Sequence, residues 1–401
     1  MKQSALLLLL ALMVAGHTQA DTLYISAQKL FTSGPDGVIE NGAVLVKDGR
    51  ITAVGKQGDV KAPADAQRVD AAVAIPGLID SHTVVGVNGG YNLPQDQDGF
   101  EKSVPSGAQF RVIDSFNPSE KLVAYAASMG TTTVHVTPQP TAPIGGSTAL
   151  LKTRGTVADD MLVKSDAAVL FNLGEAPKAA FKKTGPSTRM ATAAAIRDAL
   201  YQARSWQQTP EKKRKPNLAN QALVRVLDGD ALAVFTAHRE DDIATALRIA
   251  EEFELRAVVN YGTESYLIRQ SLVDAEATVI LAPTMQRVFG MEKRNTSLEV
   301  ASLLNEADVN FVFGSGFEAY VPKSRVLLWE VAIAVANGLP AEKAIEAATI
   351  DAAKLWGVEQ RIGSLERGKD ADIVLFDGDP FEYTSHITGV IIDGELAEKR
   401  I

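Results

Sequence analysis

The chain has 401 residues, of which 46% are hydrophobic and 22% charged, and its formal net charge is −9. These values are typical of a soluble globular protein with a sizeable core, and they exclude a disordered or a membrane-embedded chain. The negative balance disfavours nucleic acid as a partner, and the absence of cysteine excludes disulfides and thiolate metal ligands.

The N-terminal segment, residues 1–20, has the pattern of a secretory signal peptide. Lys2 precedes an apolar stretch from Ala5 to Ala15, and small residues surround a plausible cleavage point after Ala20. The apolar stretch is too short to span a bilayer. We therefore expect a periplasmic or secreted protein that has no membrane segment after cleavage.

The two ends of the mature chain share one texture. Residues 21–75 and 362–401 consist of short alternating runs separated by Gly, Asp and Asn, as in the stretches GAVLVKDGRITAVGK and DADIVLFDGDP. Such runs predict antiparallel strands joined by tight turns. We expect the two ends to form one small composite β-sandwich domain.

The middle of the chain, residues 76–361, alternates apolar strands with helices. The run ALAVFTA, for example, is followed by an amphipathic helix over residues 241–254. At least seven such strands can be counted. This number and spacing predict an α/β fold, a (β/α)8 TIM-like barrel of parallel strands.

Catalytic groups of such a barrel lie where its strands end, at the C-terminal face. Asp80 and His82 close the first strand, residues 170–174 end a middle one, His238 follows VFTA, Asn260 and Tyr261 follow RAVV, and Ser315 to Glu318 follow NFVFG. The pocket candidates are Asp80, His82, His238, Tyr261 and Glu318.

An ordered set of motifs spans nearly the whole mature chain and resembles the amidohydrolase superfamily, in particular its imidazolonepropionase-like and exported branch. The motifs are PGLIDSH at 76–82, IGGSTALLKTRG at 144–155, LGEAPK at 173–178, HREDDIATALRIAEEF at 238–253, YGTESY at 261–266 and GSLERGKDADIVLFDGDP at 363–380.

The resemblance implies one or two divalent metals at the barrel mouth. Members of this superfamily hold them with a His-x-His pair on the first strand, often a carboxylated lysine on the fourth, a histidine each on the fifth and sixth, and an aspartate on the eighth. That aspartate also moves the proton of a metal-bound water. Two of these ligands are kept, at His82 and His238, and the others are replaced by Val84, Leu170, Tyr261 and Gly316.

The replacements predict a degenerate metal site. A catalytic zinc needs about three protein ligands and an open position for water, and the general base is typically worth about 10²–10⁴-fold in rate. We therefore expect no cofactor and a non-catalytic homologue. It would bind a small amide-like or peptide-like ligand, or join a homo-oligomer or a hetero-oligomer with an active amidohydrolase.

Two enzymatic alternatives stay open. One is a hydrolase of C–N bonds in cyclic amides or dipeptides, with zinc or another divalent metal in an altered or single-metal site that draws on Glu318, Tyr261, Asp96 or Asp98. The other is a metal-free enzyme in which Asp80, His82 and His238 act as acid–base groups. The chain has no GxSxG elbow, no phosphate loop ending in GK[ST] and no HExxH pair.

Overall fold

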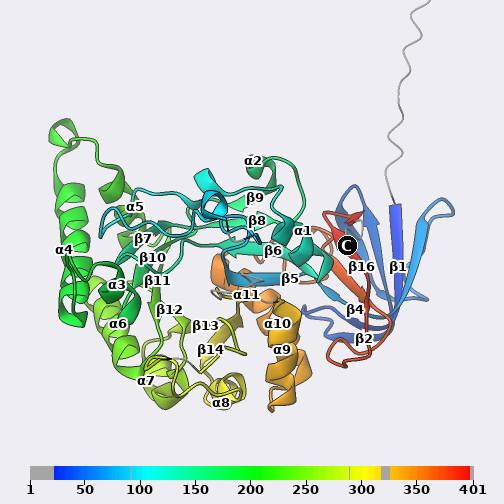
Figure 1. Ribbon diagram of the computed structural model, residues 1–401. Coiled ribbons are helices and arrows are strands. Elements are labelled where there is room, and N and C mark those ends of the chain that lie inside the picture. The colour runs from blue at the N-terminus through cyan, green and yellow to red at the C-terminus, as the bar shows by residue number, and fades with distance from the viewer. Residues whose placement is uncertain (1–21, 92, 289, 318–325, 398–401) are drawn as a thin grey trace, which may run out of the picture.

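The computed structural model describes residues 22–91, 93–288, 290–317 and 326–397. A barrel occupies the middle of the molecule, with a β-sheet at one end and the helices α4 and α5 at the other (Figure 1). Its parallel strands confirm the predicted (β/α)8 class. They are β5 (Leu78–Thr83), β6 (Thr131–Val136), β10 (Ala168–Asn172), β11 (Leu232–Ala237), β12 (Ala257–Tyr261), β13 (Thr278–Leu281) and β14 (Asn310–Phe313).

One position of the barrel departs from the expected all-parallel arrangement. Between β6 and β10 lie β7 (Ile144–Ser147), which runs antiparallel to β10, and β8 (Ala149–Lys152), which runs antiparallel to β6 and to the short β9 (Leu162–Lys164). Only residues 137–143 separate β6 from β7, and a parallel crossover needs a dozen or more residues. The chain therefore returns in the opposite direction.

Backbone contacts close the barrel at both seams. On one side, Thr83 pairs with Gly316 in a parallel bridge, and the Gly316 N–H donates to the carbonyl of His82 at 2.8 Å. On the other side, the Thr148 N–H donates to the carbonyl of Ala168 at 3.0 Å. The strand ends that carry the candidate residues therefore meet around one mouth.

The helices follow the expected amphipathic pattern, as α6 (Glu240–Phe253) shows. Its buried residues recur at helical spacing, and it ends at Glu254, which has a left-handed backbone. The other α-helices are α1 (Lys121–Ser128), α2 (Ala158–Met161), α3 (Glu175–Ala180), α4 (Arg189–Gln208), α5 (Leu218–Leu227), α7 (Arg269–Asp274), α8 (Val300–Glu306), α9 (Leu327–Ala336), α10 (Ala341–Ala347) and α11 (Ile350–Trp356). Among the described residues, no helix is long and apolar enough to cross a membrane.

Both ends of the chain build the expected composite β-domain, and its seven strands form one continuous hydrogen-bonded sheet around a core of its own. Alternate residues of its strands pack into a core of their own, while Val374, Phe376 and Val390 on the opposite face join the barrel core. The exact domain boundaries at 75/76 and 361/362 stay a prediction. Residues 1–20, the expected signal peptide, lie outside the described residues. In order, the sheet contains β17 (Glu395–Leu396), β16 (Ile387–Ile392), β15 (Ile373–Phe376), β4 (Gln67–Pro76), β1 (Thr22–Phe31), β2 (Val38–Lys47) and β3 (Arg50–Lys56).

A buried ion cluster links barrel and sheet. The Nζ atom of Lys152 lies 2.5 Å from Asp372, 3.1 Å from Asp370 and 3.0 Å from Asp393. Burial by itself lowers the pKa of Lys152, but the three carboxylates around it raise the pKa above its ordinary value. Two motifs of the family resemblance, TALLKTRG and GKDADIV, thus meet at this junction and serve the fold.

Candidate functional site

The two retained histidines lie at the mouth of the barrel with a tyrosine between them. His82 lies near the end of β5 and His238 directly follows β11. The ring of Tyr261, at the end of β12, contacts both imidazoles, with centroid separations of 5.3 Å to His82 and 4.6 Å to His238. A phenol therefore occupies the place between the two histidines.

His82 is fully buried and its ring nitrogens face side chains of the protein. Its Nδ1 lies 3.2 Å from the hydroxyl of Thr137, and the amide nitrogen of Asn260 lies 3.3 Å from both Nδ1 and Nε2. Burial lowers the pKa of His82 to about 3. The ring is therefore neutral near pH 7.

His238 is mostly buried and takes part in a chain of hydrogen bonds. Gln286 Nε2 donates to the hydroxyl of Thr263 at 2.8 Å, and this hydroxyl lies 2.7 Å from His238 Nδ1. The Thr263 hydroxyl therefore links the Gln286 carboxamide to the His238 ring. Burial, and to a smaller extent the Lys293 cation, lower the pKa of His238 to about 3.

Neutral polar side chains line the barrel beside His82. Asn172, Thr236 and Asn260 are successive partners across β10, β11 and β12, and all three are buried. Asn172 Nδ2 donates to the Ala142 carbonyl at 2.6 Å. Within the described residues, the Oδ1 atoms of Asn172 and Asn260 are buried without a hydrogen-bond partner.

Asp80 serves the closing seam of the barrel. Its carboxylate accepts hydrogen bonds from the Ser315 N–H at 2.9 Å and the Ser315 hydroxyl at 2.5 Å. It contacts His82 through the backbone N–H, at 3.2 Å. Burial raises the pKa of Asp80 to about 6, against these hydrogen bonds, which lower it. The structure thus shows Asp80 bound to the backbone of His82 and places no imidazole–carboxylate hydrogen bond there.

Apolar packing has replaced two of the family ligand positions. Val84 is fully buried in a cluster with Val134 and Val136 of β6. Leu170 faces the barrel interior, where it packs with Val234 of the next strand. Neither side chain carries an atom that could bind a metal.

The position of the family aspartate has no room for a side chain. Gly316 has a left-handed backbone, with φ at +68°. A Cβ atom there would lie 2.8 Å from Cδ of Pro283 and 3.0 Å from the backbone carbon of Ala282. Real Cβ atoms essentially never approach other atoms so closely, so an aspartate would require the backbone to shift.

The remaining candidates add no ligand set. Asp96 ends a short 3-10 helix (Pro94–Asp96) and accepts from Gln97 Nε2 at 2.7 Å, and Asp98 is exposed. Glu318 lies outside the described residues. Across the part of the chain that is described, no three His, Asp or Glu side chains are grouped so that they could hold a metal. These residues therefore do not fit a catalytic zinc, which needs about three protein ligands.

Comparison with known proteins shows which family the chain belongs to. The chain is 30% identical to an amidohydrolase from Thermotoga maritima MSB8 of known crystal structure, over 94% of this chain and 100% of that one, with a TM-score of 0.87. The chain belongs to the amidohydrolase family. The profile of the Amidohydrolase family matches residues 267–397.

The chain is also similar to more distant proteins. The imidazolonepropionase of Thermoplasma volcanium is 24% identical over 376 residues, which cover 86% of this chain and 87% of that protein. A zinc-bound adenosine deaminase from Xanthomonas campestris shares the fold, with a TM-score of 0.55 at 21% identity, over 94% of this chain and 92% of that one.

Sequence reasoning missed some neighbours of the two histidines. Thr137 follows strand β6 and Gln286 follows β13, so both occupy strand ends of the kind that the barrel rule selects. Thr263 lies within the motif YGTESY. A search of every strand end for hydroxyl and carboxamide groups, beyond ionisable ones, would have found all three.

Proposed function

We propose that this amidohydrolase-family chain is a non-catalytic homologue that acts by binding in the periplasm or outside the cell. The observation that carries the proposal is the backbone at Gly316, which leaves no space for the carboxylate that the family uses as proton shuttle. Tyr261 between the two histidines supports the same conclusion. The signal-like pattern of residues 1–20 supports export.

The ligand proposed for the barrel mouth is a small amide-like or peptide-like molecule. The site offers neutral groups, because burial holds both imidazoles uncharged near pH 7. The buried oxygens of Asn172 and Asn260 can accept hydrogen bonds from the N–H groups of such a ligand. A charged ligand would find no partner of opposite sign among these groups.

A second form of the proposal makes the chain a subunit of a mixed oligomer with an active amidohydrolase. Co-expression with an active homologue of the same family tests it. Joint elution in size-exclusion chromatography supports the mixed oligomer, and separate elution at every concentration contradicts it.

The alternative is a hydrolase of carbon–nitrogen bonds with an altered or single-metal site. Two observations favour it. His82 and His238 remain at the mouth, and similar proteins carry the names amidohydrolase, imidazolonepropionase and adenosine deaminase. Under this alternative the Tyr261 ring would have to leave its place between the histidines.

Activity measurements separate the two proposals. The purified mature chain is incubated with zinc or with chelator and then offered cyclic amides and dipeptides, beside an active amidohydrolase as positive control. We expect no turnover above the buffer blank in either condition. Turnover that needs zinc and disappears in both His82→Ala and His238→Ala would establish the altered-site hydrolase. Turnover that persists in chelator would establish a metal-free enzyme.

A further inference from the structure

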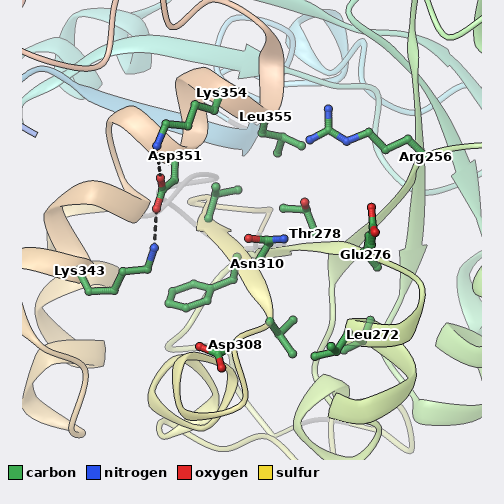
Figure 2. Close-up of a pocket in the computed structure, with 15 residues that line it drawn as sticks. Arg256, Leu272, Glu276, Thr278, Asp308, Asn310, Lys343, Asp351, Lys354 and Leu355 are labelled. Carbon is green, nitrogen blue, oxygen red and sulfur yellow. Dashed lines mark hydrogen bonds and ion pairs between the residues drawn. The ribbon is translucent and has the colours of Figure 1, made fainter. Parts of the chain in front are cut away.

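A pocket lies on the face of the barrel opposite to the histidines. Its volume is about 500 Å³, within the range of small-molecule sites. It opens where β12, β13 and β14 begin and is bordered by α7, α10 and α11 (Figure 2). This face of a TIM-like barrel ordinarily contributes to stability alone. Its polar lining is therefore unexpected.

Three polar side chains that are not engaged elsewhere reach this pocket from neighbouring strands. Arg256 directly precedes β12, while Thr278 and Asn310 are partners in the parallel ladder of β13 and β14. Within the described residues, none of these three side chains takes part in a hydrogen bond or an ion pair. In Figure 2 the guanidinium of Arg256 points across the pocket toward α11, with Thr278 and Asn310 between the two walls.

The wall formed by α10 and α11 carries two cations held by one carboxylate. Asp351 binds Lys343 Nζ at 2.5 Å and Lys354 Nζ at 3.2 Å. This leaves an excess of positive charge beside Arg256. Arg256 itself also acts on Lys164, whose pKa is lowered first by burial and then by the cations Arg225 and Arg256.

The rest of the rim carries negative charge. Glu276 and Asp308 border the same pocket, and neither has an ion-pair partner among the described residues. Figure 2 shows Asp308 on the side of the pocket away from Arg256 and Lys354. These carboxylates would repel a simple anion, and Arg256 would repel a simple cation. A molecule with one charge of each sign therefore suits the lining best.

We propose that this pocket binds a small zwitterion, an amino acid or a dipeptide, with its carboxylate on Arg256 and its ammonium group at Asp308. A guanidinium presents paired N–H donors that match the two oxygens of a carboxylate. Thr278 and Asn310 offer hydrogen bonds to the part of the ligand between its charged ends. The proposal concerns the face away from the histidines, so it stands or falls independently of the function proposed for the barrel mouth.

Calorimetric titration of the purified chain tests the proposal with glycylglycine as probe. N-acetylglycine, glycinamide and inorganic phosphate serve as comparison ligands that carry only one sign of charge. We expect saturable binding of glycylglycine at one site per chain, and weaker binding of each comparison ligand. Arg256→Gln and Asp308→Asn should each weaken glycylglycine binding about tenfold or more, since each removes a charge-assisted hydrogen bond.

Arg367→Gln is the matched control, because Arg367 is an exposed arginine outside the pocket. It should leave the affinity unchanged, and all variants should keep the thermal midpoint of the parent, since the altered side chains are exposed. Absence of saturable glycylglycine binding overturns the proposal, as does an unchanged affinity in Arg256→Gln. Equal or tighter binding of phosphate or N-acetylglycine also overturns it and indicates a general anion site.

Discussion

Restoring the family aspartate by Gly316→Asp should destabilise the fold instead of rebuilding a catalyst. The left-handed backbone at φ +68° costs a side chain about 1–2 kcal/mol. The Cβ contact of 2.8 Å with Pro283 adds an overpacking term of about 1–3 kcal/mol. The free energy of unfolding should therefore fall by about 2–5 kcal/mol, before the burial of the new carboxylate is counted.

Gly290 provides a matched control for the backbone term. Its φ is +67°, and nothing lies within 4 Å of the Cβ that a substitution would add. Gly290→Asp should therefore lose only the conformational part, about 1–2 kcal/mol. Urea unfolding of both variants, followed by circular dichroism, isolates the steric part as the difference between them. Equal losses in the two variants would refute the reasoning, and so would zinc-dependent hydrolysis by Gly316→Asp.

Three further predictions concern stability. Lys152→Met should lower the free energy of unfolding by about 3–5 kcal/mol, because it leaves buried carboxylates without their cation. Its control, Arg154→Met, breaks the exposed pair with Glu395 and should change the free energy of unfolding by less than about 1 kcal/mol. Similar losses for the two variants in urea unfolding would contradict this. Ser315→Ala should cost about 1–3 kcal/mol by removing a hydrogen bond to buried Asp80, and an unchanged urea midpoint would show that the seam does not need it. Below about pH 6.5 the unfolded chain protonates His82, His135 and His238, whereas burial lowers their pKa values to about 3 in the folded chain, so the free energy of unfolding should fall by up to about 1.4 kcal/mol per histidine and pH unit. Asp80 and Glu292, whose pKa values burial raises to about 6 and about 7, act in the opposite sense. Equal free energies of unfolding at about pH 7 and about pH 5 would contradict net control by the histidines.

The sequence predicted the barrel because its strands are continuous apolar runs, each buried on both sides. The sequence did not predict that β7 and β8, which lie between β6 and β10, run antiparallel to these neighbours. The pattern of apolar residues in a strand does not encode the strand's direction. That direction follows from the short connection over residues 137–143, a constraint on chain length. The β-domain built from both chain ends was predicted from the alternation and the turns, which predict strands but not their order in the sheet.

The site was predictable as a set of residue types and unpredictable as a set of contacts. Matching motifs assigned His82, His238, Tyr261 and Gly316 to strand ends at one mouth, and the structure places them there. The sequence could not reveal that Tyr261 contacts both histidines or that Pro283 closes the space at Gly316. Those facts depend on tertiary packing between strands far apart in the chain.

The metal content of the purified mature protein tests the central claim most directly. After exposure to zinc and extensive dialysis, elemental analysis should find far less than one metal ion per chain, with no difference between the parent and the variants His82→Ala and His238→Ala. About one tightly held zinc per chain in the parent, lost in both variants, would contradict the non-catalytic account and establish a rebuilt metal site.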